Sequence, residues 1–163
     1  MRIVGIDPGL RITGYGVVDE RKGHLQLIEA GMIQSSIKMG IAQRLESIHQ
    51  GVRNLLIDVR PDVMVLDKIF TNVKHITTSL IMGHARGVIC LAAGQERVPL
   101  VSLASTRVRK SILSNGHASK EQIQRAVQNY LHLKEAPKPL DVSDALALAI
   151  SYAMNRRFHI QRS

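Results

Sequence analysis

The chain has 163 residues, 45% of them hydrophobic, and a formal net charge of +9 at pH 7. This length and composition predict one domain with its own core, and the basic excess favours a polyanionic partner such as nucleic acid. The single cysteine, Cys90, excludes an intrachain disulfide, and no apolar run reaches about 18 residues. We therefore expect a cytoplasmic protein without a membrane segment.

Three strands are predicted near the start of the chain. A short apolar run at residues 3–6 is stopped by an Asp-Pro-Gly turn, and two longer strand-like runs cover residues 12–18 and 25–33. A charged, turn-like stretch at residues 19–23 separates the two longer runs. The short connections predict an antiparallel meander.

Helices and strands then alternate. Apolar residues spaced by threes and fours from Ile41 to Val59 predict a helix that Pro61 closes. Residues 63–66 form a buried fourth strand that leads into Asp67. A second helix is expected over residues 77–93, and a fifth strand over residues 99–103.

The last third of the chain is predicted to be helical. A short helix is expected over residues 105–113, and Ser119 with Gln122 forms a capping box that opens a helix running to Leu131. Two prolines, at positions 137 and 139, separate that helix from the last one. We assign residues 1–155 to one domain, and residues 156–163 to a basic, flexible tail that adds nonspecific attraction to DNA.

This order of elements predicts an α/β fold. We expect a five-stranded mixed sheet, with three antiparallel strands followed by parallel strands, flanked by helices. The first and fourth strands can then be neighbours whose carboxyl ends lie at the same edge. Active sites in such sheets collect beyond the carboxyl ends of the strands.

Four aspartates mark that edge. Asp7 and Asp67 follow the first and fourth strands, and Asp141 and Asp144 are three residues apart on one face of the last helix. Carboxylates that converge without cations repel one another and raise each other's pKa values. Divalent cations such as Mg²⁺ or Mn²⁺ neutralise such a cluster, so the pattern favours metal-assisted phosphoester chemistry.

Each of these residues also has a purely structural interpretation. Asp7 can be a turn former before Pro8, Asp67 a surface residue that ends a strand, and Asp141 a helix N-cap. Their joint occurrence at the expected places in the topology favours the metal site. The spacing is suggestive and does not identify the polymer that is cut.

Four segments carry a resemblance to a known family. They are MRIVGIDPGLRITGYGVV, VMVLDKIF, SLIMGHARGVICLAA and LDVSDALALAI. In order and interval they resemble the RuvC-type Holliday junction resolvases, which are crossover junction endodeoxyribonucleases. The resemblance implies a ribonuclease H-like fold and a homodimer that nicks two opposed strands of a four-way DNA junction, leaving 5′-phosphate and 3′-hydroxyl ends. It also implies a branch-migration motor as a plausible partner.

The same resemblance implies the ligands of the metal. It places two Mg²⁺ ions, for which Mn²⁺ can substitute, on the four carboxylates of Asp7, Asp67, Asp141 and Asp144. The family usually has glutamate where this chain has Asp67, and the change shortens the side chain by one methylene. Active sites tolerate only about 0.5 Å of misplacement, so we expect reduced cleavage or a catalytically impaired junction-binding protein. The neighbouring Lys68 adds an ammonium that competes with metal unless strand alternation turns it away.

Two residues beyond the fourth strand are candidate DNA contacts. Phe70 stands where the family has an aromatic residue that wedges against unpaired bases, and such stacking contributes about 1 to 3 kcal/mol per base. A core or dimer-interface aromatic is the alternative for Phe70. Lys74 stands where the family commonly has asparagine, so a phosphate contact is expected there.

Basic residues after the fifth strand are the other candidates. Arg107, Arg109 and Lys110 form a basic run on the predicted short helix, and Lys120 opens the next helix. Arg109 and Lys120 match positions that the family uses on phosphates near the cleavage site. A solvated charged face is the alternative for the run.

The helix predicted over residues 77–93 has an unusually smooth surface. Its small residues are Gly83, Ala85, Gly87, Ala92 and Ala93. They permit close approach of another helix, either inside the monomer or across a two-fold axis. The resemblance favours the two-fold interface.

Other classes of protein share parts of this pattern. The run GIDPGLRITGYG resembles the first phosphate loop of actin-like ATPases and sugar kinases, but those need two such domains, for which 163 residues are too few. A ribonuclease H-like nuclease that acts on RNA or on RNA/DNA hybrids remains an alternative, because the acidic cluster does not specify the polymer.

Overall fold

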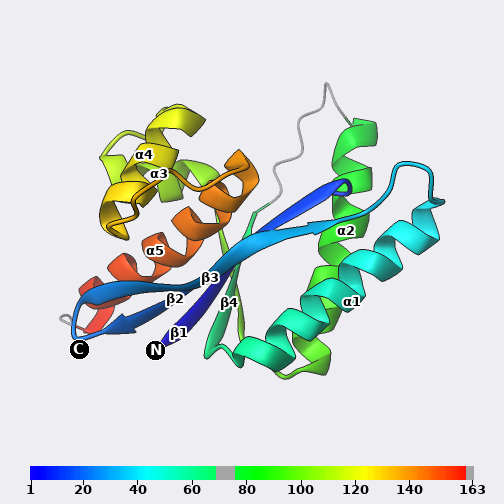
Figure 1. Ribbon diagram of the computed structural model, residues 1–163, viewed down its shortest axis with the longest axis horizontal. Coiled ribbons are helices and arrows are strands. Elements are labelled where there is room, and N and C mark those ends of the chain that lie inside the picture. Colours follow the sequence, from blue (N-terminus) through cyan, green and yellow to red (C-terminus); the bar gives the residue numbers. More distant parts are fainter. Residues whose placement is uncertain (69–75, 161–163) are drawn as a thin grey trace.

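A computed structural model describes residues 1–68 and 76–160 (Figure 1). The strands are β1 (Arg2–Asp7), β2 (Ile12–Arg21), β3 (His24–Gln34), β4 (Val63–Asp67) and β5 (Leu100–Leu103). The helices are α1 (Ile41–Val59), α2 (Ile76–Gln95), α3 (Ser105–Leu113), α4 (Lys120–Tyr130) and α5 (Leu140–Ile160).

The strands form one five-stranded mixed sheet in the order β3-β2-β1-β4-β5. β1 pairs antiparallel with β2, and β2 with β3, whereas β1 with β4 and β4 with β5 are parallel. The central strands β1 and β4 are continuously apolar because both of their faces are covered. These pairings confirm the predicted fold class and the parallel contact between the first and fourth strands.

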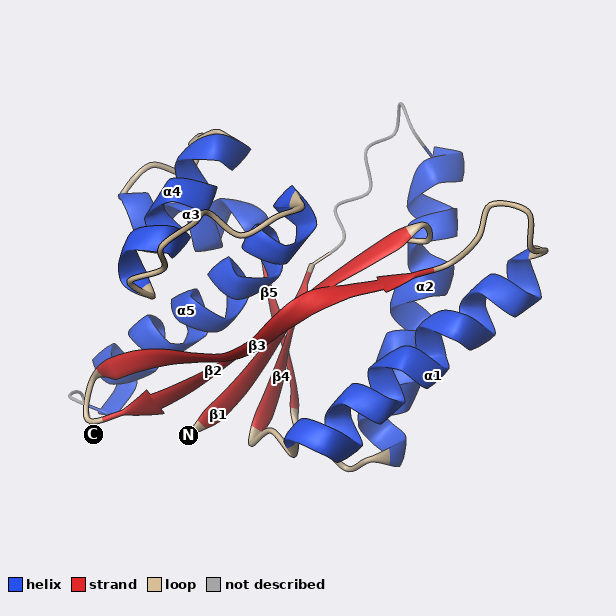
Figure 2. Cartoon of the chain, viewed as in Figure 1, coloured by secondary structure: helices blue, strands red, loops and turns tan. Residues whose placement is uncertain are grey.

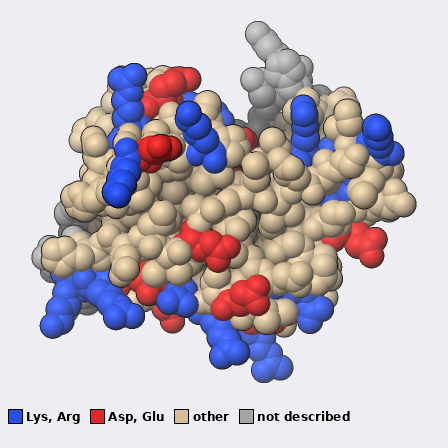
Figure 3. Space-filling model, in the orientation of Figure 1, with Lys and Arg blue, Asp and Glu red and all other residues tan. Residues whose placement is uncertain are grey.

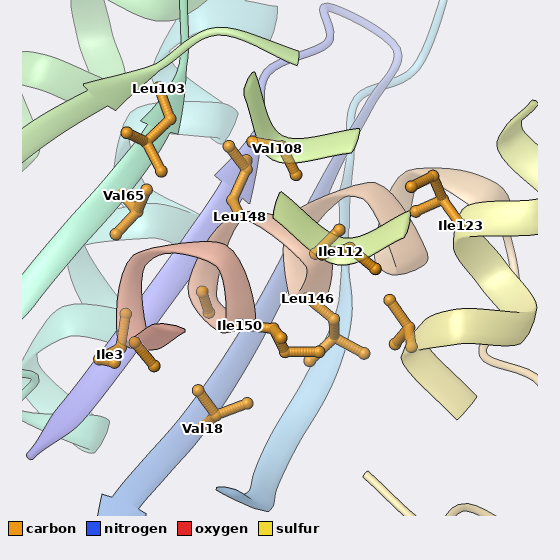
Figure 4. Packing of buried hydrophobic residues seen from close by; sticks show 14 of the residues in the cluster. Ile3, Val18, Val65, Leu103, Val108, Ile112, Ile123, Leu146, Leu148 and Ile150 are labelled. Carbon is orange, nitrogen blue, oxygen red and sulfur yellow. The ribbon is translucent and has the colours of Figure 1, made fainter. Parts of the chain in front are cut away.

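Helices cover both faces of the sheet. α1 and α2 lie on one face, and α5 with α3 and α4 lies on the other (Figure 2). On the α5 side, Ile3, Val18 and Val65 of the sheet pack against Leu146 and Ile150 of α5 (Figure 4). The two clusters of buried side chains make the sheet the middle layer of the molecule.

Glycines let α5 lie very close to the sheet. A Cβ atom at Gly5 would collide with the carbonyl oxygen of Ala145, and one at Gly14 would collide with the carbonyl oxygen of Asp141. The backbone of α5 therefore rests directly on β1 and β2. This close approach fixes the first turn of α5 beside the carboxyl end of β1, where the candidate site begins.

Local signals place several element boundaries as predicted. α1 ends at Val59, where Arg60 adopts a left-handed conformation with a φ of 45° ahead of Pro61. At the start of α4, the Ser119 hydroxyl accepts the Gln122 amide at 3.2 Å, and the Gln122 side chain accepts the Ser119 amide at 2.8 Å. The predicted capping box is thus confirmed.

The smooth surface of α2 divides into two sides. Ala85, Ala92 and Ala93 are buried against the protein's own core. A Cβ atom at Gly83 or Gly87 would meet no atom within 4 Å, so these glycines face outward. Packing within the monomer therefore explains the alanines and leaves the glycines on an open face.

The end of the chain is helical further than expected. α5 runs through Ile160, past the predicted domain boundary at residue 155, so the first part of the predicted tail is helix. Residues 161–163 lie outside the described part of the chain. Among the described residues, no helix is both long and apolar enough to cross a membrane.

The net positive charge is spread over the surface. On the face seen in Figure 3, Lys and Arg side chains stand around the rim with Asp and Glu among them, and much of the middle is uncharged. Binding to a polyanion therefore depends on where basic residues lie relative to the candidate site.

Candidate active site

Three of the four aspartates line one pocket at the carboxyl edge of the sheet. Asp7 ends β1, Asp67 ends β4, and Asp144 extends from the first turns of α5 into the same pocket, whose volume is about 200 Å³. Asp141 does not line the pocket, but it lies close enough to act on Asp7 electrostatically. The parallel pairing of β1 with β4 brings the two strand-end carboxylates together, as the sequence predicted.

Asp7 is the electrostatic centre of the group. Its burial, followed by the negative charges of Asp144 and Asp67 and, more weakly, that of Asp141, raises the pKa of the Asp7 carboxyl to about 7. The Lys120 ammonium acts in the opposite direction and offsets part of this rise. Asp7 thus sits where negative charge is least well compensated.

Asp67 is held by groups from two neighbouring elements. The hydroxyl of Ser105, at the start of α3, is 3.0 Å from each carboxylate oxygen of Asp67. Burial and the charge of Asp144 raise the pKa of Asp67, while the Ser105 hydrogen bond, the Lys68 amide and the Arg86 guanidinium oppose that rise. The Asp67 side chain is therefore restrained by hydrogen bonds within the pocket.

Lys120 provides the cation that contacts Asp144. Its ammonium lies 2.7 Å from an Asp144 carboxylate oxygen, and this hydrogen bond is the main cause of the raised pKa of Lys120. The Lys120 side chain is 48% exposed, so it can leave the pocket without crossing packed core. The contact links the first residue of α4 to the acidic cluster.

The donors fit a divalent cation in kind. Carboxylate oxygens are the hard ligands that Mg²⁺ and Mn²⁺ prefer. A cation would offset the burial and the repulsion that together raise the pKa of Asp7. Within residues 1–68 and 76–160, however, no three His, Cys, Asp or Glu side chains stand close enough together to hold one ion. For a cation to bind beside Asp144, the ion pair between Lys120 and Asp144 would have to open.

The predicted basic residues divide into two groups. Arg109 and Lys120 line the pocket beside the aspartates. Arg107 and Lys110 are exposed on α3 and do not line it. Geometry thus brings together with the acids the same two basic positions that the resemblance singled out.

Two predicted DNA contacts lie outside the described residues. These are Phe70 and Lys74, which fall between β4 and α2. Lys68 is described: its side chain is exposed and does not line the pocket, which agrees with the prediction from strand alternation. The ammonium that contacts the cluster belongs to Lys120 instead.

Two residues near Asp67 escaped the sequence reasoning. Ser105 contacts its side chain, and Arg86 of α2 donates to its main-chain carbonyl oxygen and to the Ser102 hydroxyl, the latter at 2.6 Å. A signal for Ser105 existed, because a residue just past a strand parallel to β4 falls beside the end of β4. No local pattern singled out Arg86, whose contact depends on how α2 packs.

Comparison with known proteins identifies the family of this chain. The family model for the crossover junction endodeoxyribonuclease RuvC matches residues 3–152. A RuvC from Brevibacillus brevis is 43% identical over 158 residues, which cover 97% of this chain and 95% of the relative.

Solved structures agree as well. The Thermus thermophilus RuvC structure superposes with a TM-score of 0.87 at 30% identity, covering 98% of this chain and 97% of that one. The same protein in complex with a Holliday junction substrate gives a TM-score of 0.87 at 29% identity, covering 97% and 96% of the two chains. The fold is therefore ribonuclease H-like, and the chain belongs to the RuvC family of crossover junction endodeoxyribonucleases.

Proposed function

We propose that this protein resolves four-way DNA junctions by metal-dependent nicking of two opposed strands, leaving 5′-phosphate and 3′-hydroxyl ends that a ligase can seal. The observation that carries the proposal is the convergence of Asp7, Asp67 and Asp144 in one pocket next to Arg109 and Lys120. Membership of the RuvC family supports DNA junctions, rather than RNA or hybrids, as the substrate. The proposed setting is recombination and repair of DNA in the cytoplasm.

The carboxylates of Asp7, Asp67, Asp141 and Asp144 are the proposed metal ligands. Mg²⁺ bound there, with Mn²⁺ as a substitute and two ions per site as the expected number, would lower the pKa of the attacking water and stabilise the leaving 3′ oxygen. Asp7 would be the central ligand, because the charges of the other three carboxylates all act on it. Asp67 and Asp144 line the same pocket as Asp7.

The basic residues beside the pocket have a separate proposed role. Arg109 and Lys120 would bind phosphates next to the cleaved bond, and Lys120 would exchange its contact with Asp144 for one with DNA when metal enters. Arg107 and Lys110 would extend the phosphate contacts along α3. Phe70 and Lys74 stay proposed contacts of the crossover.

A homodimer is part of the proposal, with the outer face of α2 as its interface. Leu80, Gly83, Gly87, Leu91 and Gly94 recur at helical spacing on that face. Leu80 is 63% and Leu91 is 53% exposed, and the glycines leave room for close approach of a second helix. A two-fold dimer would match the symmetry of paired cuts, and a branch-migration motor is the proposed further partner.

A junction-binding protein that does not cut is the second candidate. Two points favour it. Asp67 is one methylene shorter than the glutamate that the resemblance implies at this position, and no three acidic side chains among the described residues are close enough to hold an ion. In that case the basic residues would bind the junction, and Asp144 would remain paired with Lys120.

One experiment separates these candidates. Gel shifts on four-way, duplex and hybrid substrates, followed by addition of Mg²⁺ or Mn²⁺, are run on this chain and on Asp67→Glu side by side. Symmetric nicks in the four-way junction by the unchanged chain support the nuclease. Tight junction binding without nicks, restored to cleavage by Asp67→Glu, would leave the binding protein and identify its cause.

A further inference from the structure

Ser105 stands between the fifth strand and the acidic cluster. Asp67 pairs with Leu103 in the sheet, and Ser105 follows two residues later at the first position of α3. Its hydroxyl is within hydrogen-bonding distance of both Asp67 carboxylate oxygens, at 3.0 Å each, and lines the same pocket. A hydroxyl at hydrogen-bonding distance from both oxygens restrains the position of the carboxylate.

The main chain at Asp67 is held independently of this contact. The Lys68 amide donates to the Leu103 carbonyl oxygen at 2.8 Å, and the Arg86 guanidinium donates to the Asp67 carbonyl oxygen. The end of β4 therefore cannot advance into the pocket to compensate for a short side chain. How far the Asp67 carboxylate reaches depends on its own two torsion angles, and Ser105 restrains those.

The Ser105 hydroxyl is not occupied in starting the helix. Ala104 is the N-cap of α3, and it makes no side-chain capping bond. Each Asp67 carboxylate oxygen has a second lone pair, which can bind another group in the pocket. The hydrogen bond thus orients the carboxylate and leaves it able to bind a cation.

We propose that Ser105 is a positioning residue that holds the short Asp67 side chain in the orientation in which it ligates a divalent cation. The inference rests on the proposed metal-dependent function. It predicts that serine and aspartate act as a unit, because the hydroxyl matches the reach of an aspartate and not that of a glutamate. Residues that orient metal ligands affect metal affinity by about 10- to 100-fold.

The test measures Mn²⁺ binding directly, without DNA and without turnover. Full-length protein is titrated with Mn²⁺, and free Mn²⁺ is followed by electron paramagnetic resonance. Ser105→Ala should weaken Mn²⁺ binding by about tenfold, and Ser105→Thr, which keeps the hydroxyl, should restore it. The matched control is Ser111→Ala on the same helix, because Ser111 bonds to Ser151 at 2.7 Å, away from the pocket.

A double-mutant cycle then asks whether the serine acts through Asp67. In the Asp67→Glu background, Ser105→Ala should change Mn²⁺ affinity by less than about threefold, because the longer carboxylate extends past the hydroxyl. Circular dichroism melting of each variant checks that the chain is folded. Coupling between positions 67 and 105 is a result that a purely structural serine would not produce.

The outcomes are distinct. Unchanged Mn²⁺ affinity in Ser105→Ala, or equal weakening in both backgrounds, overturns the inference. A chain that binds no Mn²⁺ overturns the inference together with the metal-dependent function. Junction cleavage is assayed separately, so Mn²⁺ binding that shows the predicted coupling but no cleavage upholds the positioning role and rejects the nuclease.

Discussion

The β1–β2 strand pair has an aspartate at each end, and the two carboxylates have opposite surroundings. At one end Asp19 lies directly across from Arg2, and at the other Asp7 lies across from Gly14. Arg2 donates to the two Asp19 oxygens at 2.9 and 3.1 Å, and this pairing lowers the pKa of Asp19. Asp7 is largely buried and has three carboxylates around it, and together these raise its pKa to about 7.

We infer from this difference that Asp19 serves stability and Asp7 serves function. Asp19, which is paired with the Arg2 guanidinium, helps to hold the two strands together. Asp7, which is surrounded by other carboxylates, lowers stability in the absence of a cation. Lys120 offsets part of that cost through Asp144 and Asp7. A protein keeps such an arrangement where the charge has a use, and perturbed pKa values in a pocket are typical of functional sites.

The largest effect should come from Asp7→Asn in a cleavage assay. Removing the central carboxylate should lower the rate of junction cleavage by at least about a thousandfold, while junction affinity in a gel shift stays within about threefold. Asp19→Asn at the other end of the strand pair is the matched control and should leave cleavage of the folded protein intact. Loss of junction binding by Asp7→Asn would make that aspartate structural.

The same pair of substitutions should have opposite effects on stability. Because the pKa of Asp7 is raised in the folded protein, the stabilisation that its protonated form provides is complete below the ordinary pKa of 3.8. This stabilisation is lost as the pH rises through about 7. Without metal at pH 8, Asp7→Asn should therefore raise the free energy of unfolding by about 2 to 4 kcal/mol, measured by urea denaturation in EDTA. At pH 3 the advantage should vanish, and a gain that did not depend on pH would contradict the electrostatic cause.

Asp19→Asn should instead destabilise the protein. Because the pKa of Asp19 is lowered in the folded protein, ionised Asp19 stabilises the fold above pH 3.8. This stabilisation is lost as the pH falls through the lower pKa of the folded state. We expect a lower free energy of unfolding at pH 7, because Arg2 would lose its charged acceptor. Urea denaturation at pH 7 measures this loss, and an unchanged midpoint would show that the ion pair is not stabilising.

Gly14→Ala should displace the first turn of α5 from the sheet. The added Cβ would collide with the Asp141 carbonyl oxygen, so α5 must shift, and we expect a loss of about 1 to 3 kcal/mol in the free energy of unfolding. Gly40→Ala before α1 is the control, because its Cβ would meet no atom within 4 Å and Gly40 lies outside the proposed dimer face. Thermal and urea denaturation compare the two, and equal stability of both variants would argue against the close approach of α5.

The smallest effect should come from Arg109→Ala. One lost phosphate contact should reduce the slope of log affinity against log salt for junction binding by about 1. Arg21→Ala removes the same charge at the far end of β2, where the side chain is 81% exposed, and should leave the slope unchanged. Equal slopes for both variants would show that Arg109 acts only through net charge.

Much of the fold was predictable because its signals are local. The continuous apolar runs before Asp7 and Asp67, the proline after α1 and the capping box at Ser119 mark elements through chemistry within a few residues. The sequence did not predict where α5 ends, since the residues near position 155 include no Gly or Pro to stop a helix. The α2 glycines remained ambiguous, because small residues permit close packing without specifying the partner.

The sequence by itself determined that acids follow the strands, that the last helix carries two more, and that the chain resembles one family of junction nucleases. Only the tertiary structure decided how these acids are compensated. Lys120 reaches Asp144 from the start of α4, and Ser105 reaches Asp67 from the start of α3, through contacts across 24 and 38 positions of the chain. Charge and burial at a site depend on distance in space, which spacing along a chain does not fix.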